Sequence, residues 1–177
     1  GNPAQIFGEL LTLIESSKRN PKDAIQLCYP SSEGDDSAVY LPNNLYILGT
    51  MNIADRSLAL VDMAFRRRFA FINLDPNFND AWRDYVVNKK EMDLNMANFI
   101  QRTLINLNTQ ISSDPKLGKD FQVGHSFFTP NNSLEGKDSK DWFKDIVKTE
   151  IKPLLEEYWF DSLEDSEKAI AQLTSNL

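Results

Sequence analysis

One short stretch is the most informative part of this chain: Leu45-Tyr-Ile-Leu-Gly-Thr-Met-Asn52. Its apolar run follows Pro42-Asn43 and ends at a polar cluster, a pattern that predicts a buried strand over residues 45–51. In an α/β sheet, ligands are handled just beyond the carboxyl ends of the strands. The sequence therefore predicts a functional edge at Asn52 and at Asp55, which lies in the turn that follows.

Three consecutive arginines, Arg66, Arg67 and Arg68, come next. A helix is predicted over residues 56–66 before them and a short strand over residues 69–74 after them. Cations at a helix C-terminus complement the helix dipole, which is one explanation for this block. However, three adjacent guanidiniums repel one another and cannot deprotonate, so the block needs anions to face. Phosphate is the candidate anion.

The remaining pattern before residue 75 predicts a helix and a hairpin. Apolar residues recur at helical spacing over residues 4–18. Residues 24–44 alternate apolar and polar positions on either side of a polar tip, which predicts a β-hairpin. Its tip, residues 31–37, carries three acids and no base.

Beyond Pro76 the pattern becomes mainly helical. Helices are predicted over residues 79–88, 94–111, 139–158 and 163–174, and a loop predominates over residues 112–137. The prediction is therefore two domains: residues 1–75, an α/β part that carries the candidate site, and residues 76–177, a small helical domain.

Composition narrows the class of protein. The net charge of −7 and the pI near 4.8 argue against a general DNA-binding surface, which would show a basic face. One cysteine and one histidine exclude an internal disulfide, a Cys/His metal cluster and a Cys/His or Ser/His/Asp triad. No run of 18 apolar residues occurs, so we expect a soluble protein with no membrane association. The single cysteine suits a reducing cytoplasm, and we expect no metal site in this chain.

Several blocks of sequence resemble one family, the GTPase subunit (McrB) of 5-methylcytosine-specific restriction systems, a prokaryotic branch of the AAA+ ATPases. The signature of that family is matched by Met51-Asn-Ile-Ala-Asp-Arg-Ser57, by Leu58 to Asp62 and by Arg66 to Phe69. Further matches cover residues 6–15, 123–128 and 151–160. The resemblance implies an α/β fold, the C-terminal half of an AAA+ P-loop NTPase core, followed by a helical lid. The resemblance also implies that the hairpin predicted over residues 24–44 is the helix-2 insert of this branch of AAA+ proteins.

The phosphate-binding loop of such proteins is missing from this sequence. A Gly-x-x-x-x-Gly-Lys-Ser/Thr string is required, and the glycine–lysine pairs at residues 118–119 and 136–137 are each followed by Asp. The acidic motif that binds magnesium in the family is missing too. We therefore expect a C-terminal fragment of a longer protein that uses GTP or ATP with Mg²⁺, and no nucleotide cofactor for the fragment alone.

The resemblance implies catalytic roles at six positions. Asn52 takes the sensor-1 place, where an amide orients water or reads the γ-phosphate; the alternatives are a plain turn residue and a guanine-reading residue. Asp55 and Arg56 support catalysis near the subunit boundary or cap the next helix. Asp62 holds a nearby arginine or is a surface charge. The last two positions, Arg67 and Arg68, are arginine fingers that reach a neighbouring subunit's nucleotide.

Two further positions are implied to touch the cofactor. Arg66 is expected to form a salt bridge or a lid contact near the nucleotide. His125, in the matched Gly-His-Ser-Phe-Phe block, contacts the nucleotide or a neighbouring subunit, or is a hydrogen-bonded structural histidine.

The implied function is a subunit of an oligomeric NTPase motor of a restriction system. The implied partners are other copies of itself in a hexameric ring, an McrC-type nuclease subunit, and DNA through a separate domain. Nucleotide hydrolysis would drive DNA translocation or cleavage by the nuclease. Two alternatives remain: a non-catalytic AAA+-like interaction module, and an ATP-dependent remodelling protein unrelated to restriction.

Overall fold

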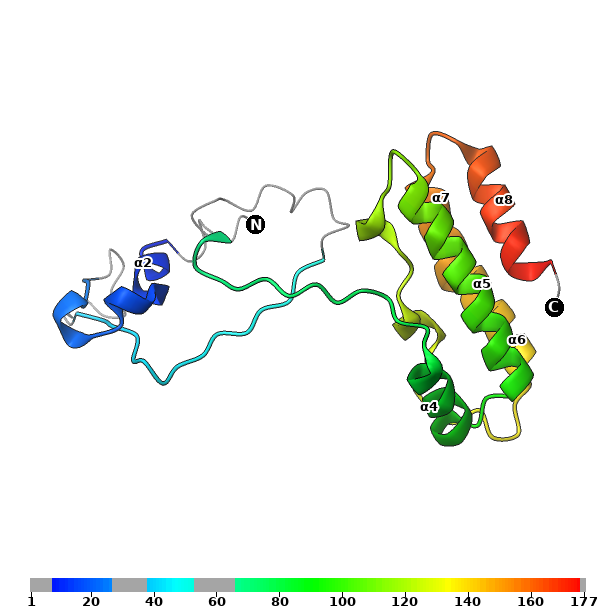
Figure 1. Cartoon of the computed structure of the whole chain (residues 1–177), viewed down its shortest axis with the longest axis horizontal. Coiled ribbons are helices and arrows are strands. Elements are labelled where there is room, and N and C mark those ends of the chain that lie inside the picture. The colour runs from blue at the N-terminus through cyan, green and yellow to red at the C-terminus, as the bar shows by residue number, and fades with distance from the viewer. Residues whose placement is uncertain (1–7, 27–37, 53–65, 176–177) are drawn as a thin grey trace. The chain divides into compact units, whose positions relative to one another are not determined.

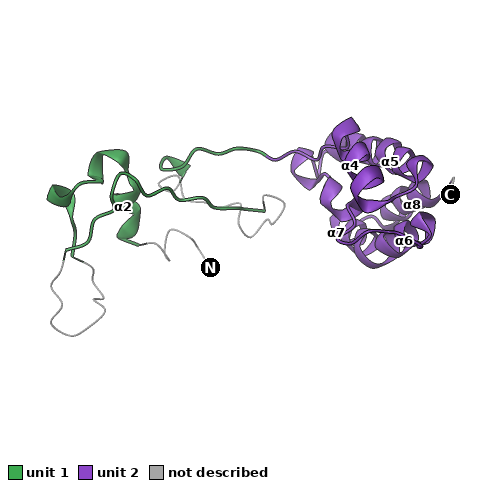
Figure 2. Ribbon diagram, turned by 90° about the horizontal axis from the view of Figure 1, so that it is seen from below, with its two compact units in different colours: residues 1–73 green, residues 74–177 purple. Residues whose placement is uncertain are grey.

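The structure, a computed structural model, describes residues 8–26, 38–52 and 66–175 of the chain. These residues fall into two compact units, unit 1 up to Asn73 and unit 2 from Leu74 onward (Figure 2). The sequence analysis placed its domain boundary after residue 75. Each unit is described by itself below.

Unit 2 is helical, as the sequence predicted (Figure 1). Its α-helices are α4 (Asp80–Lys90), α5 (Leu94–Ser113), α6 (Ser139–Ile146), α7 (Lys152–Tyr158) and α8 (Leu163–Thr174). Two short 3₁₀ turns, η4 (Lys119–Phe121) and η5 (His125–Phe128), lie in the loop between α5 and α6. The four helices predicted beyond Pro76 are therefore confirmed.

Side-chain caps mark where α4 and α5 begin. Asn79 accepts a hydrogen bond from the Trp82 N–H at 2.9 Å, and Asp93 accepts one from the Met96 N–H at 2.9 Å. Each cap satisfies a donor that has no partner within its own helix. Helix α4 ends where Glu91 adopts a left-handed conformation with φ of 56°.

The helix predicted over residues 139–158 is continuous but not uniform. A π-helical turn, η6 (Val147–Ile151), joins α6 to α7. It lies just before Pro153, which has no N–H and whose ring would clash with the carbonyl four residues earlier in a regular α-helix. A wider turn at this point relieves that conflict.

The core of unit 2 is built on one face of α5. The apolar side chains at helical spacing along this face are almost completely buried: Ile100, Leu104, Leu107 and Ile111. They belong to one cluster with Phe143 and with residues of η6, α7 and α8: Ile151, Leu155 and Leu173. Each such side chain stabilises the fold by about 1.5–3 kcal/mol.

The loop after α5 is fastened to the core by a buried amide. Asn108, 5% exposed, donates from Nδ2 to the Val123 carbonyl at 2.9 Å. The same side chain accepts from the Val123 N–H through Oδ1 at 2.7 Å. Both backbone groups of Val123 are therefore satisfied by one side chain inside the core.

Unit 1 contains short helical turns: α2 (Leu10–Ile14), η1 (Ser16–Lys18) and η2 (Pro21–Asp23). The helix predicted over residues 4–18 is shorter among the described residues, because Glu15 is extended and ends α2. An antiparallel bridge joins Ile25 to Val39, with N–H···O distances of 3.0 and 2.8 Å. This bridge pairs the two arms of the predicted hairpin, whose tip lies outside the described residues.

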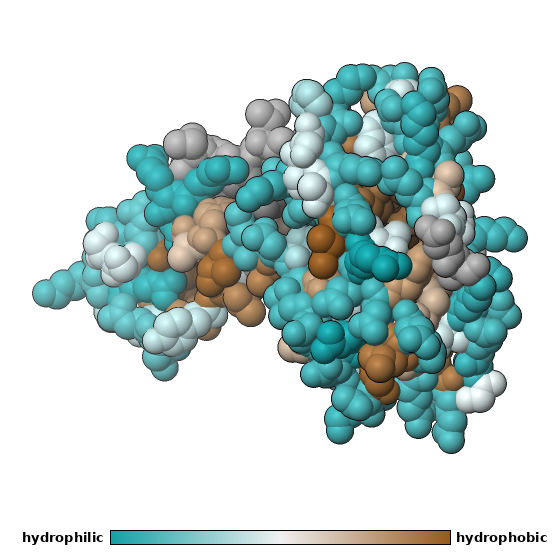
Figure 3. Space-filling view, turned by 45° about the vertical axis from the view of Figure 1, so that its right-hand side comes forward, coloured by the Kyte–Doolittle hydropathy of each residue, from teal (hydrophilic) through white to brown (hydrophobic). Residues whose placement is uncertain are grey.

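The strands predicted over residues 45–51 and 69–74 are not found. These segments are extended, but among the described residues the Ile25–Val39 bridge is the only β pairing. The side chains of Tyr46, Leu48 and Ile72 are 89, 96 and 83% exposed. Figure 3 shows hydrophobic residues among hydrophilic ones on the surface of the protein. Local pattern sets the tendency to form a strand, whereas the ladder needs a neighbouring strand. The described residues therefore do not show the α/β core half.

The predicted helix over residues 56–66 lies outside the described residues except for its last position. Among the helices that are described, none has both the length and the apolar character required to cross a bilayer.

Candidate functional site

A hollow of about 640 Å³ lies in unit 1 at the C-terminal end of α2. Its lining is mostly polar and contains two of the predicted finger residues: Ile14, Glu15, Ser16, Ser17, Arg19, Asn43, Arg67 and Arg68.

Arg68 forms an ion pair with Glu15 at the edge of α2. The arginine side chain is 16% exposed and the glutamate side chain 40%. A guanidinium so far removed from water needs an opposite charge, because the alternative is a buried charge without compensation. This pair joins residues from two segments that are far apart in the sequence.

Arg19 forms a second link at the same place. Its Nε donates to the Ile14 carbonyl at 3.0 Å, and its Nη1 donates to the Leu45 carbonyl at 2.6 Å. The first bond satisfies a carbonyl at the end of α2 that has no partner within the helix. The second attaches the start of the segment 45–52 to α2.

The three consecutive arginines have different environments. Arg66 and Arg67 are exposed, and the Arg66 guanidinium lies 5.7 Å from the centre of the Phe71 ring, within cation–π range. Arg67 and Arg68 line the hollow, whereas Arg66 is not among its lining residues. The structure therefore brings together two of the three.

Of the other predicted catalytic residues, the structure describes Asn52 alone. Asn52 is exposed at the end of an extended segment and is not among the residues that line the hollow. Asp55, Arg56 and Asp62 lie outside the described residues, so their predicted roles are not tested.

His125 belongs to unit 2 and has defined contacts there. Its Nδ1 accepts from the Asn77 N–H at 3.1 Å, which places the proton of the neutral ring on Nε2. The Phe78 and His125 rings pack edge to face, with 6.2 Å between their centroids. The His125 backbone carbonyl accepts a hydrogen bond from the Thr129 hydroxyl at 2.8 Å. These contacts are those of a half-buried structural histidine, and a cofactor contact at His125 stays a prediction.

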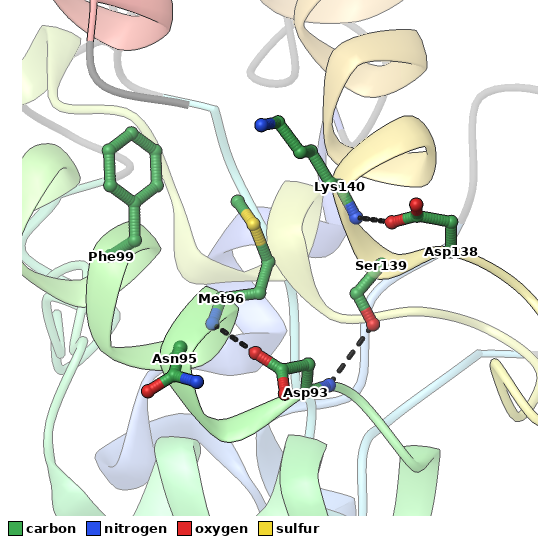
Figure 4. Close-up of a pocket in the computed structure, with 7 residues that line it drawn as sticks. All are labelled: Asp93, Asn95, Met96, Phe99, Asp138, Ser139 and Lys140. Atoms are coloured by element: carbon green, nitrogen blue, oxygen red, sulfur yellow. Dashed lines mark hydrogen bonds between the residues drawn. The ribbon is translucent and has the colours of Figure 1, made fainter.

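A second hollow, of about 280 Å³, lies in unit 2 where α5 and α6 begin (Figure 4). Helix N-termini attract anions, but here Asp93 and Asp138 already cap the two helices with their own carboxylates. The Asp93 N–H also donates to the Ser139 hydroxyl at 3.0 Å. The positions that an anion would occupy are therefore filled by the protein.

The chemical groups that line the hollow in unit 1 determine which part of a magnesium nucleotide they could bind. Three guanidiniums, two hydroxyls and an amide line the hollow in unit 1, and these groups suit phosphate oxygens. Among the described residues there is no group of three or more His, Cys, Asp or Glu side chains that could hold a metal ion. The guanidinium, hydroxyl and amide groups of this hollow therefore fit a phosphate.

The sequence analysis missed Glu15 and Arg19. Both follow the apolar run of α2 and read as ordinary surface charges. The signal available in the sequence was their spacing of four residues, because residues four apart lie on the same face of a helix. Their partners, Arg68 and Leu45, are distant in sequence and could not be inferred from it.

Comparison with known proteins gives two kinds of match. Residues 99–167 match the family described as McrB, alpha-helical lid domain. Over 164 residues the chain is 44% identical to the Type IV methyl-directed restriction enzyme EcoKMcrB subunit of Escherichia coli (strain K12), covering 90% of this chain and 35% of that protein. It is 27% identical over 174 residues to the Type II restriction enzyme BsuMI component YdiS of Bacillus subtilis (strain 168), covering 88% of this chain and 45% of that protein.

The chain thus spans less than half the length of either of these curated relatives. The family match falls within unit 2, the helical unit. The resemblance read from the sequence motifs is confirmed: the chain is similar to the E. coli McrB subunit over 90% of its length, and its residues 99–167 match the α-helical lid domain of McrB.

Proposed function

We propose that this chain is part of an oligomeric AAA+ NTPase subunit of a restriction system. In this proposal the longer protein hydrolyses GTP or ATP with Mg²⁺ in a hexameric ring, and this chain contributes residues that complete the nucleotide site of a neighbouring subunit. An McrC-type nuclease subunit and DNA, bound through a separate domain, are the proposed partners. The 44% identity to the E. coli subunit supports this class of protein.

One observation carries the proposal at the level of chemistry. Arg19, Arg67 and Arg68 line a single hollow, although they come from two separate segments. Guanidinium groups only donate hydrogen bonds and match the geometry of phosphate oxygens. A hollow with three of them and one carboxylate has a net positive lining, and a nucleotide phosphate is the anion that fits it.

The proposed contribution to hydrolysis is electrostatic. Arg67 and Arg68 neutralise charge that develops on the transferring phosphoryl group, an effect on the order of 10³–10⁵ in rate when an arginine finger supplies it. Asn52 orients the attacking water, Asp62 holds one of the nearby arginines, and Asp55 and Arg56 support catalysis near the subunit boundary. Bound Mg²⁺ would neutralise phosphate charge, and its ligands would come from other parts of the longer protein.

The exposed apolar segments fit the same proposal. Residues 45–51 and 69–74 are extended and rich in apolar side chains, with Leu48 and Leu74 96 and 90% exposed. Strands of a parallel sheet covered on both faces have this composition. We propose that both segments are strands of an α/β core that the rest of the longer protein completes. Asn52 would then stand at a strand end.

The arginine fingers give the most direct test. In the full-length protein, Arg67→Ala or Arg68→Ala should lower kcat for GTP or ATP hydrolysis on the order of 10³-fold. Nucleotide affinity should stay within several-fold, because a finger acts on the transition state and not on ground-state binding. Arg102→Ala, which removes an exposed arginine from α5, is the matched control and should leave kcat unchanged.

Rings assembled from two variants show whether the arginines act on the nucleotide of a neighbouring subunit or on that of their own subunit. A ring that mixes a finger variant with a phosphate-loop variant contains some interfaces with both parts intact, so part of the hydrolysis should return. If rings shown to be mixed recover nothing, the arginines act within their own subunit. If neither arginine affects hydrolysis, the chain is a non-catalytic interaction module instead.

A further inference from the structure

We propose that Glu15 is a positioning residue for Arg68, and that Arg19 secures the helix end from which Glu15 acts. The inference rests on the proposed function, because it concerns how one of the proposed fingers is held. Glu15 directly follows α2, whereas the finger block lies more than fifty residues later in the chain. Their ion pair links the two segments.

Charge explains why Arg68 needs such a partner. Arg67 and Arg19 line the same hollow as Arg68, so the hollow carries two further positive charges. Of the described residues that line the hollow, Glu15 is the only carboxylate. Removing that carboxylate would take away a negative charge that offsets the mostly buried Arg68 guanidinium, which favours a different side-chain position.

The backbone around Glu15 is itself held in place. Glu15 ends α2 with an extended conformation, ψ of 132°. Directly before it, the Ile14 carbonyl accepts the Arg19 Nε–H at 3.0 Å, and the same guanidinium reaches the Leu45 carbonyl at 2.6 Å. Arg19 therefore fixes both the helix end that presents Glu15 and the start of the segment that leads to Asn52.

A held guanidinium is expected to act more effectively than a free one. An arginine side chain loses conformational freedom when it contacts a phosphate, and this loss costs free energy. A side chain that an ion pair already holds has less freedom to lose. Small misplacements of catalytic groups can lower rates by about 10²-fold. The ion pair should therefore contribute to kcat and not to nucleotide affinity.

The test uses the full-length protein and three variants. Glu15→Gln keeps the size of the side chain but removes its charge, and Glu15→Asp keeps the charge on a shorter side chain. Asp23→Asn is the matched control, since it removes a carboxylate that pairs with Lys18 at 3.0 Å in the same unit but outside the hollow. The readouts are kcat and KM for GTP and ATP, and hydrogen exchange of the backbone at residues 66–70.

We expect Glu15→Gln to lower kcat by about 10- to 100-fold with KM within about twofold, and to speed exchange at residues 66–70. Glu15→Asp should recover part of the rate, and Asp23→Asn should match wild type. In an Arg68→Ala background, Glu15→Gln should lower kcat little further, because the two residues act as one unit.

The outcomes separate this inference from the proposed function. If Arg68→Ala lowers kcat but Glu15→Gln changes neither kcat nor exchange, Glu15 is not a positioning residue. A rise in kcat on Glu15→Gln would also overturn the inference, since the carboxylate would then compete with the phosphate. If Glu15→Gln speeds exchange while Arg68→Ala leaves hydrolysis intact, the pair exists and the finger role is wrong.

Discussion

The indole Nε1 of Trp159 donates a hydrogen bond to Asp114 Oδ2 at 2.8 Å. Trp159 follows the last residue of α7 and Asp114 follows the last residue of α5, so this bond ties together the ends of two helices in the lid. The other carboxylate oxygen accepts from the Lys116 N–H at 2.7 Å. Both bonds favour the ionised carboxylate, and the one from Trp159 is the main reason that the pKa of Asp114 is lowered.

The first prediction concerns acid stability. Because the folded pKa of Asp114 lies below its unfolded value, its contribution is fully present above the ordinary value of 3.8 and is lost as pH falls through the lower folded pKa. Asp114→Asn can still accept from Trp159 but cannot ionise. Wild type should therefore be more stable than the variant near neutral pH, and the difference should vanish in acid.

Urea unfolding of both proteins, followed by circular dichroism at a series of pH values, measures this difference directly. A difference in the free energy of unfolding that stays constant down to strongly acidic pH would show that the Asp114 carboxylate does not titrate as described.

The second prediction concerns the buried amide of Asn108. Asn108→Leu removes both hydrogen bonds to Val123 and leaves two buried backbone groups without partners. The variant should lose roughly 2–4 kcal/mol of unfolding free energy. Asn106→Leu, an exposed position on the same helix, should stay within about 0.5 kcal/mol of wild type. Equal stabilities of the two variants would mean that the loop does not depend on Asn108.

A third prediction concerns nucleotide binding by the 177-residue chain alone. The sequence has no phosphate-binding loop, and such a loop supplies most contacts to a triphosphate. We expect calorimetry to detect no binding of GTP or ATP to this chain. Saturable, magnesium-dependent binding at micromolar nucleotide would contradict the prediction.

The fourth prediction concerns the hairpin tip, residues 31–37. Three acids and no base should repel a DNA backbone, so we expect the tip to contact a protein partner, either the nuclease subunit or a neighbouring protomer. Shortening the tip to a glycine-containing turn in the full-length protein should leave basal hydrolysis intact and weaken stimulation by the nuclease subunit. Normal stimulation with loss of DNA-dependent activity would instead identify a DNA-contacting element.

Local pattern explains why the lid helices were predictable. Ile100, Leu104, Leu107 and Ile111 recur at helical spacing, and caps such as Asp93 mark where helices begin. Both signals lie within a few residues of the element that they specify. The π-turn was not predicted, because the sequence analysis read residues 139–158 as one helix and did not consider what Pro153 does to the preceding turn.

By itself, the sequence determined the helical lid, the McrB-type motifs and the presence of an arginine block that needs anions. Tertiary structure alone decided which of those arginines share a hollow, that Glu15 pairs with Arg68, and that Arg19 reaches Leu45. The physical reason is the range of the interactions. Helical periodicity and caps are local, whereas ion pairs and strand ladders form between distant segments, so only the path of the folded chain determines their partners.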